Sequence, residues 1–381
     1  MGQYRLGARS AEGIALELEV SARRVRQLYA SYLEAVADGR GAGWEAGRSG
    51  GNRRRDIPPD VETLWRRLLS TRPPAPYGFI VSEASRRCRF EIDRATARRW
   101  ALEQGLAHSK PKDRTRAPVR RWQAQRVGEL WQLEASPHRW LGPAHESFPL
   151  LDMVDDCTRL ITGARVYPRE CQLAYLDFLR RAFEEYGLPL QLYVDYHSLF
   201  FTAVPESLSY LGECLRFYGI SFKYAPTPQA KGKIERQHQF WQNRLPAYAQ
   251  AENITEITVL DPHLQALRVH HNQHEIHREL QMTPQQAWRA AQREKRSVLR
   301  PKPACPWWPY IWTIRCNMRV DIDGRVSAGT LRLRIARPPF SRVTRCEHPD
   351  GSFTFLAQAP GTGGRPIVLL RVGPSGTPWN I

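Results

Sequence analysis

The stretch LQLYVD, residues 190–195, decides the fold of this 381-residue chain. Its mostly apolar run is typical of a buried β-strand, and it ends on an acid, Asp195. A second acid, Glu235, lies in QAKGKIERQHQFWQ, residues 229–242, where the pattern predicts a helix. The 39 residues between the two acids leave room for one helix, the strand SFKYAP and a Gly/Pro-containing loop. The chain can therefore return to the same sheet edge, and we expect the two carboxylates to meet there.

A third acid, Glu134, lies upstream in GELWQLEASPHRW, residues 128–140, where the sequence predicts another strand. Three acids on two strands and a helix suit a divalent-metal site, because Mg²⁺ prefers oxygen ligands and keeps several waters. The sequence therefore predicts that Glu134, Asp195 and Glu235 form one site.

Five blocks of the chain resemble the integrase catalytic core of bacterial insertion-sequence transposases, which are relatives of retroviral integrases. They are WQLEASPHRW (131–140), LLDMVDDCTRLITGARV (150–166), LYVDYHSLF (192–200), APTPQAKGKIERQHQFWQNRL (225–245) and HNQHEIHRELQMTPQQAW (271–288). The order and spacing match over roughly residues 127–292. The resemblance implies a ribonuclease-H-like α/β core with a mixed sheet and the activity of a polynucleotidyl transferase.

By this resemblance the three acids hold two Mg²⁺ ions, for which Mn²⁺ can substitute. Asp195 would bridge both ions, Glu235 would bind one, and Glu134 would take the place of the other bridging aspartate. Such ions lie about 3.5–4 Å apart and act on the attacking and leaving oxygens of a phosphodiester. The attacking group is water in strand cleavage and a DNA 3′-hydroxyl in strand transfer.

Glu134 departs from the family pattern, in which an aspartate is expected. Glutamate is one methylene longer, and a displacement of about 1 Å in a catalytic group can cost on the order of 100-fold in rate. Two functions therefore stay open. One is a DNA transposase that binds terminal inverted repeats and performs Mg²⁺-dependent cleavage and strand transfer. The other is a catalytically impaired derivative that acts as a sequence-specific DNA-binding protein or repressor.

Other polar residues near the three acids have two interpretations each. Asp155 and Asp156 lie at a strand-to-turn junction, where aspartate commonly hydrogen-bonds the backbone; the alternative for the nearby Asp152 is a substitute metal ligand. Lys231 and Lys233 precede Glu235, so we expect them and the helix start to face a DNA phosphate, with a solvated surface pair as the alternative.

Histidine and cysteine patterns do not predict a zinc site. His138 and His197 follow Glu134 and Asp195 closely, and each either orients a ligand or packs in the core. We interpret the histidines in HHNQHEIHREL as surface residues; they include His270, His274 and His277. The seven cysteines contain no CxxC pair, so we expect no disulfide framework either.

The net charge of +18 is unevenly distributed along the chain. Residues 1–126 carry 26 basic and 14 acidic side chains, residues 127–293 carry 16 and 19, and residues 294–381 carry 14 and 5. A slightly acidic centre between basic flanks suits DNA-binding arms around a metal site, since phosphate neutralisation supplies most nonspecific affinity. A solvated basic surface is the alternative.

Two segments of the basic N-terminal part predict helix-turn-helix units. In residues 10–38, Ser21 is expected to cap the second helix. The inner face of this unit is expected to be formed by Ile14, Leu18, Val25, Leu28 and Tyr29. In residues 77–106, Asp93 is the expected cap of the later helix. The side chains expected to reach a DNA groove are Arg23, Arg24, Arg26 and Gln27 in the first unit and Arg94, Arg98 and Arg99 in the second.

Residues 310–360 alternate apolar and polar side chains around two Asp-Gly turn signals, at Asp323 and Asp350, and predict a small β-barrel. We expect Trp307, Trp308 and Trp312 in the core of that barrel. The expected domains are a helix-turn-helix (1–40), a Gly/Arg linker (41–56), a second helical unit (57–108), a basic linker (109–126), the integrase-like core (127–293), a Pro-rich linker (294–309), the barrel (310–360) and a loose tail (361–381).

The expected partners are transposon ends and target DNA, bound by a homo-oligomer, because two ends must be held together. No apolar stretch approaches the roughly 20 residues of a membrane span, and the first ten residues lack the apolar centre of a secretory signal. We therefore expect a cytoplasmic, nucleoid-associated bacterial protein without a membrane partner.

Overall fold

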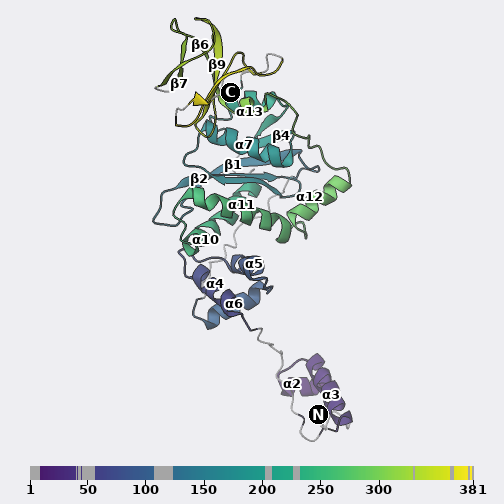
Figure 1. Cartoon of the computed structure of the whole chain (residues 1–381). Coiled ribbons are helices and arrows are strands. Elements are labelled where there is room, and N and C mark those ends of the chain that lie inside the picture. Colours follow the sequence, from purple (N-terminus) through teal and green to yellow (C-terminus); the bar gives the residue numbers. More distant parts are fainter. Residues whose placement is uncertain are drawn as a thin grey trace. The chain divides into compact units, whose positions relative to one another are not determined.

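A computed structural model describes residues 9–39, 41, 44, 56–106, 123–201, 208–225, 232–328, 331–360, 364–375 and 378–379. The chain divides into two compact units, Met1–Pro58 and Pro59–Ile381. Figure 1 labels the helices and strands of both units. In the part of the chain that is described, no helix combines the length and the apolarity needed to cross a bilayer.

The first unit contains two helices, α2 (Ala11–Glu17) and α3 (Ala22–Ala37). Ser21 caps α3 as predicted, because its side chain accepts a hydrogen bond from Arg24 N at 3.2 Å. The small core is formed by Ala11, Ala15 and Val25, with Ile14 packed against it. Leu18 was expected on this inner face, and that prediction is wrong: the residue is 55% exposed because α2 ends one residue before it.

The second unit begins with three helices, α4 (Pro59–Leu69), α5 (Tyr77–Cys88) and α6 (Arg94–Glu103). Asp93 caps α6 as predicted, accepting hydrogen bonds from the backbone of its next turn. Trp65 is fully buried between the helices and donates its ring N–H to Ile80 O at 2.8 Å. The ring of Trp100 packs edge-on against Trp65, so these two tryptophans form the centre of the bundle.

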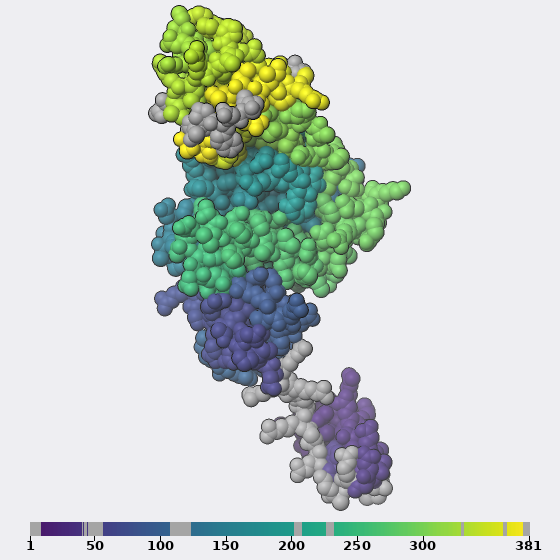
Figure 2. Space-filling view, viewed as in Figure 1, coloured from purple at the N-terminus to yellow at the C-terminus, as the bar shows by residue number. Residues whose placement is uncertain are grey.

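These three helices lie against the following α/β core. In Figure 2 their side chains, coloured blue, meet the green side chains of the core helices in continuous contact. Arg67 and Arg87 both reach Glu252 of the core, at 2.7 and 2.8 Å, and Ser82 donates to Glu275 at 2.8 Å.

The core is a five-stranded mixed sheet in the order β3-β2-β1-β4-β5. Its strands are β1 (Leu130–His138), β2 (Phe148–Asp155), β3 (Ile161–Val166), β4 (Gln191–Val194) and β5 (Ser221–Tyr224). The first three pair antiparallel, whereas β4 is parallel to both β1 and β5. The predicted mixed α/β core is thereby confirmed.

Helices cover both faces of this sheet, as Figure 1 shows. On one face α7 (Gln172–Tyr186) and α8 (Tyr210–Arg216) pack over the odd-numbered β1 residues, such as Trp131 and Leu133. On the other face lie α9 (Gly232–Gln242), α10 (Leu245–Ala251) and α11 (Ile257–His274). Because strand side chains alternate, this second face receives the even-numbered β1 residues, Glu134 among them. The last core helix, α12 (Pro284–Arg293), begins with a capping box formed by Thr283 and Gln286.

The C-terminal strands form open sheets in the described residues, so the predicted small β-barrel is not confirmed. One sheet has the order β12-β11-β10-β9-β6 and leaves β12 and β6 as edges; the other is the hairpin β7-β8. The strands are β6 (Ile314–Arg319), β7 (Arg325–Ala328), β8 (Leu331–Arg334), β9 (Arg342–Glu347), β10 (Phe353–Leu356), β11 (Val368–Val372) and β12 (Pro378–Trp379). The cause is the pairing: β6 pairs with β9 and β7 with β8, so the Asp323 turn joins two strands that do not pair with each other. The second expected hairpin, β9-β10 around Asp350, is confirmed.

Trp307, Trp308 and Trp312 are buried, but not where the sequence predicted. They surround the short helix α13 (Trp308–Ile311) and belong to the large core cluster of the mixed sheet. Trp312 lies 5.5 Å from the Phe183 ring, and Trp308 lies 5.0 Å from the Tyr218 ring. The C-terminal sheet has a separate small cluster, to which none of the three tryptophans belongs.

The segment before α13 lies along the core. Ser297 forms a bridge with Val127, and Arg300 forms one with Leu188. The Arg300 guanidinium donates hydrogen bonds to the carbonyl oxygens of Tyr218 at 2.7 Å and Pro189 at 3.1 Å.

Candidate active site

Glu134 lies in β1, and Asp195 directly follows the neighbouring parallel strand β4. The register pairs Gln132 of β1 with Tyr193 of β4, and each acid comes two residues after one member of this pair. Neighbouring strands lie about 4.8 Å apart, so the same register brings the two backbones side by side. Asp195 follows the last residue of β4 and is partly exposed.

The charges of Glu134 and Asp195 both affect the pKa of Tyr175 in α7. The pKa of its hydroxyl is raised by burial and by the neighbouring Glu170, and the charges of Asp195 and Glu134 raise it further. The hydroxyl donates a hydrogen bond to Glu170 Oε1 at 2.8 Å. Glu134 and Asp195 therefore share one electrostatic neighbourhood.

Helix α9 runs along β1, and the spacing of the contacting residues matches between the two elements. Three contacts link every fourth helical residue to every second strand residue: Ile234 N to Gln132 Oε1 at 3.3 Å, His238 Nδ1 to Glu134 Oε2 at 3.9 Å, and Gln242 Nε2 to Ser136 Oγ at 3.1 Å. Four helical residues rise about 6 Å and two strand residues about 6.6 Å, which explains the match.

Glu235 lies in the first turn of α9 and is exposed. Its neighbour Ile234 is fully buried, and His238, one turn later, faces Glu134. The helix therefore presents Glu235 on the same side of the sheet as Glu134.

Asp152 is a fourth acid on this face, directly opposite Glu134 in the β1-β2 register. It is completely buried, and Trp241 of α9 donates its ring N–H to Asp152 Oδ2 at 3.1 Å. Burial raises the pKa of Asp152 well above its usual range, against the opposing effect of the Trp241 hydrogen bond, and the charge of Glu134 raises it further. Burial thus favours the protonated form of Asp152.

Asp155 and Asp156 hydrogen-bond the backbone at the end of β2, as predicted. Asp155 accepts from Gly128 N at 2.9 Å and Thr158 N at 2.8 Å, and Asp156 accepts from Ala124 N at 2.7 Å. Burial raises the pKa of Asp155 to about 6, although these hydrogen bonds act in the opposite direction.

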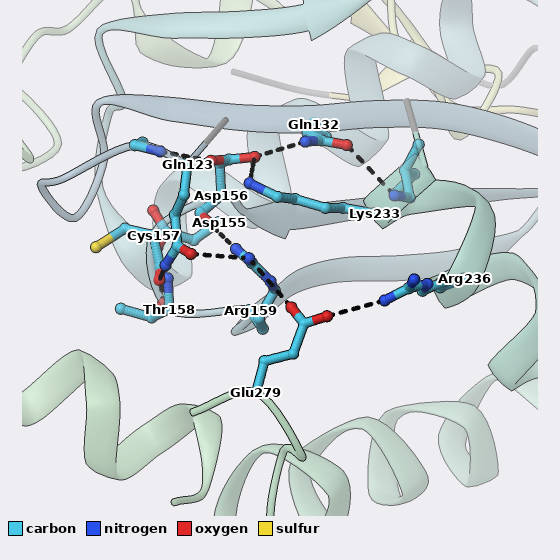
Figure 3. A network of polar contacts seen from close by, with 12 residues as sticks. Gln123, Gln132, Asp155, Asp156, Cys157, Thr158, Arg159, Lys233, Arg236 and Glu279 are labelled. Atoms are coloured by element: carbon cyan, nitrogen blue, oxygen red, sulfur yellow. Dashed lines mark hydrogen bonds and ion pairs between the residues drawn. The ribbon is translucent and has the colours of Figure 1, made fainter. Parts of the chain in front are cut away.

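Lys233 points into the protein. Its ammonium lies 2.6 Å from Asp156 Oδ1, and its side chain is only 14% exposed. Figure 3 shows Lys233 and Gln132 converging on the Asp156 carboxylate. Burial lowers the pKa of Lys233, while Asp156 opposes this effect. Lys231, the other expected phosphate contact, lies outside the described residues.

Carboxylates are suitable ligands for a hard divalent cation, but their oxygens do not converge here. In the described ranges no three His, Cys, Asp or Glu side chains come close enough to hold one metal ion. Glu134 Oε2 is directed at His238, and Glu235 is exposed on the helix surface. Metal binding by Glu134, Asp195 and Glu235 therefore stays a prediction.

The two histidines near these acids differ in their surroundings. His138 is half-buried with its ring 4.9 Å from that of Trp140, and burial lowers its pKa. His197 is exposed, and its backbone N–H donates to Asp195 Oδ1 at 3.2 Å. His197 therefore helps to orient Asp195 through its main chain.

The expected DNA-binding side chains lie on two helices. On α3, Arg23, Arg26 and Gln27 are exposed and Arg24 is half-buried, while Arg26 pairs with Glu12 at 2.5 Å. On α6, Arg94, Arg98 and Arg99 are exposed. Each helix thus offers a cationic face, and base or phosphate contact by these residues stays a prediction.

Gln132 is the polar residue of this region that the sequence prediction missed. It is 3% exposed, donates to Asp156 Oδ1 at 2.6 Å, and accepts from Ile234 N at 3.3 Å. The available signal was strand alternation, which puts Gln132 on the same face as Glu134, two residues later.

Comparisons with known proteins agree with the expected family. No protein-family model matches the chain. The putative transposase y4bF of Sinorhizobium fredii (strain NBRC 101917 / NGR234) is 31% identical over 160 residues, which are 40% of this chain and 35% of that protein. The transposase for insertion sequence IS1202 of Streptococcus pneumoniae is 34% identical over 127 residues, which are 32% of this chain and 27% of that protein. The chain thus spans about a third of the length of these curated relatives, and its predicted resemblance to insertion-sequence transposases is confirmed.

Solved structures give remote likenesses. The HTLV-2 integrase catalytic core domain in complex with magnesium (trimeric form) has a TM-score of 0.35 and 15% identity, covering 44% of this chain and 99% of that one. The simian T-cell lymphotropic virus intasome in complex with PP2A regulatory subunit B56 gamma has a TM-score of 0.39 and 14% identity, covering 72% and 95%.

Proposed function

We propose that this chain is a DNA transposase that cleaves and joins strands at the ends of an insertion sequence. What supports the proposal is that Glu134 lies in β1, Asp195 directly follows the neighbouring parallel strand β4, and Glu235 lies on α9, whose first turn contacts β1 through Ile234 and Gln132. Similarity to two transposases over 160 and 127 residues supports the same reaction class.

Glu134, Asp195 and Glu235 would hold the divalent cation, with Mg²⁺ as the natural ion and Mn²⁺ as a substitute. When bound, two such ions activate the attacking oxygen and stabilise the leaving oxygen of a phosphodiester. The protein's own contribution is to hold these carboxylates on rigid elements, the strands β1 and β4 and the helix α9. Burial raises the pKa of Asp152 beside Glu134, which opposes a further negative charge at this place.

The cationic faces of α3 and α6 would bind the transposon ends. Their exposed arginines suit phosphate contact, because a guanidinium can donate two hydrogen bonds to one phosphate. A homo-oligomer would bring two ends together, and the slightly acidic core would act between them. A cytoplasmic, nucleoid-associated location follows from this role.

The test is cleavage of a labelled duplex that carries an inverted repeat from the flanks of the coding region. We expect Mg²⁺-dependent nicking by the wild type and none by Asp195→Asn or Glu235→Gln. Glu134→Asp, which restores the shorter acid, is expected to raise the rate. Wild-type nicking no greater than that of the two inactive controls would refute the proposed reaction.

A second candidate is a DNA-binding protein or repressor without catalysis. The observation that favours it is Glu134, whose longer side chain reaches to 3.9 Å from His238 Nδ1. On this alternative the inverted-repeat duplex is bound with sequence preference, Asp195→Asn leaves its Kd unchanged, and neither Mg²⁺ nor Mn²⁺ supports nicking.

A further inference from the structure

Residues before and after Glu235 in the first turn of α9 form hydrogen bonds or ion pairs with residues outside the helix. We infer that Gln132, Asp156 and Lys233 are positioning residues that fix Glu235 relative to Glu134, and that Lys233 serves this role in place of binding DNA. The inference rests on the proposed function, because it concerns the same three acids.

Gln132 links the two elements that carry the acids. Its amide nitrogen donates to Asp156 Oδ1 at 2.6 Å, and its amide oxygen accepts the backbone N–H of Ile234 at 3.3 Å. That N–H belongs to the first turn of α9, where backbone donors have no partner within the helix. Since Gln132 precedes Glu134 by two residues and Ile234 precedes Glu235 by one, a single buried amide connects the two acids.

Asp156 and Lys233 form the second link. The Asp156 carboxylate is completely buried. It accepts hydrogen bonds from Ala124 N and Gln132 Nε2 and pairs with the Lys233 ammonium at 2.6 Å. An ammonium that is 14% exposed and paired in this way is directed away from any DNA on the surface. The ion pair therefore anchors the residue two positions before Glu235.

A third link lies on the other side of Glu235. Arg236 pairs with Glu279 at 3.0 Å, and Glu279 lies 3.8 Å from Arg159, whose guanidinium donates to the Asp156 carbonyl oxygen. Figure 3 shows this chain of side chains returning from α9 to the turn that carries Asp156. Both neighbours of Glu235 are thus connected to the end of β2.

The far end of α9 offers a matched contact that should not affect Glu235. Gln242 Nε2 donates to Ser136 Oγ at 3.1 Å, so it is also a glutamine amide between α9 and β1, two turns away from Glu235. Gln132→Met and Gln242→Met therefore remove comparable groups at opposite ends of the helix.

The first experiment compares these two variants in the inverted-repeat assay and in hydrogen exchange. We expect Gln132→Met to lower kcat by about 10- to 100-fold, because small displacements of a catalytic group cost rates of this order. The Kd for the duplex should stay within about twofold of wild type, and Gln242→Met should retain kcat within about threefold. Equal losses of kcat in both variants would overturn the inference.

The second experiment separates positioning from DNA contact at Lys233. A phosphate contact predicts that Lys233→Met weakens duplex binding and lowers the slope of log K against log salt by about 1. Positioning predicts an unchanged slope and Kd, a lower kcat, and recovery of much of the rate in Lys233→Arg, which keeps the cation. If Lys233→Met does not fold, Gln132→Met still decides, because an unchanged kcat in that variant contradicts the inference.

Hydrogen exchange distinguishes this inference from the proposed function itself. If the wild type does not cleave DNA, the transposase proposal fails, yet the Ile234 amide can still be followed. Faster exchange at Ile234 in Gln132→Met than in Gln242→Met supports the link between β1 and α9. Equal exchange in both variants refutes it, whatever the activity.

Discussion

Asp152 and Asp156 are two buried acids four residues apart on the same face of the sheet, yet their surroundings differ. Asp156 receives an ammonium, a side-chain amide and a backbone N–H. Asp152 receives the Trp241 ring N–H and has no cation in contact among the described residues, and burial raises its pKa well above its usual range. The difference shows that burial alone does not decide the surroundings of an acid: Asp156 has a cation, an amide and a backbone donor that connect it to α9 and β1, whereas Asp152 has the Trp241 ring donor.

The largest expected effect is that of Lys233→Met, which leaves the buried Asp156 carboxylate without its cation. Removing one partner of a buried ion pair costs about 3–5 kcal/mol. Urea unfolding of the full chain measures the loss. Lys233→Met combined with Asp156→Asn should recover part of it, since asparagine carries no charge and its amide oxygen can still accept a hydrogen bond. A loss below about 1 kcal/mol in the single variant would contradict a stabilising role for this buried ion pair.

Asp152→Asn should behave in the opposite way, because asparagine resembles the neutral acid and can still accept from Trp241. The pKa of Asp152 is raised in the fold, so its favourable contribution is present below the unfolded pKa and is lost as the pH rises toward the folded pKa. Relative to wild type, Asp152→Asn should therefore gain stability with rising pH, by up to about 1.4 kcal/mol per pH unit. Urea unfolding of the wild type and of Asp152→Asn at about pH 5 and at about pH 8 provides the comparison; these values lie roughly 1.5 units below and above the ordinary histidine pKa. A difference that does not change with pH would mean that Asp152 is ionised at both values.

The next prediction concerns His277, whose pKa is affected by burial and by nearby cationic side chains. Its pKa is lowered to about 4, first by burial and then by the charges of Arg159, His271 and Arg236. Since the neutral form is favoured in the fold, its contribution to stability is present above the unfolded pKa near 6.5 and is lost as the pH falls toward about 4. The side chain is only partly buried, so we expect an effect on the order of 1 kcal/mol across this window. His277→Gln should flatten the pH dependence of unfolding there, and an unchanged profile would contradict the lowered pKa.

Glu279→Gln should have the smallest effect. The variant breaks the 3.0 Å pair with Arg236, whose side chain is 59% exposed, and exposed pairs contribute about 0–1 kcal/mol. Unfolding at low and at high salt checks the assignment, because screening should remove even this small difference. A loss as large as that of Lys233→Met would mean that Glu279 acts as a buried group.

The sequence predicted those features that depend on local patterns. The strands predicted around Glu134 and before Asp195 are β1 and β4, which pair in parallel, and the predicted caps at Ser21 and Asp93 are confirmed. The turn role of Asp155 and Asp156 also followed from short-range chemistry.

Long-range partners were not predictable in the same way. The Lys233–Asp156 pair joins residues 77 positions apart, and a lysine beside a helix start looks the same in sequence whether it faces solvent or a buried acid. Strand pairing of β6 with β9 decides between an open sheet and a barrel, and alternation within each strand carries no information about this choice. The burial of Trp312 was correct, but only tertiary packing shows that its partner is Phe183.

The route of the chain from Arg300 to Trp312 has a practical consequence for dissecting the protein. Arg300 donates hydrogen bonds to the carbonyl oxygens of Pro189 and Tyr218. Trp308 and Trp312 belong to the apolar cluster that also contains residues of α7 and α8. A truncation after α12 would strip these groups from the remaining fragment and expose the rings of Phe183 and Tyr218 to water. A fragment meant to isolate the mixed-sheet domain should therefore extend past Thr313, whose carbonyl oxygen accepts a hydrogen bond from the hydroxyl of Tyr210.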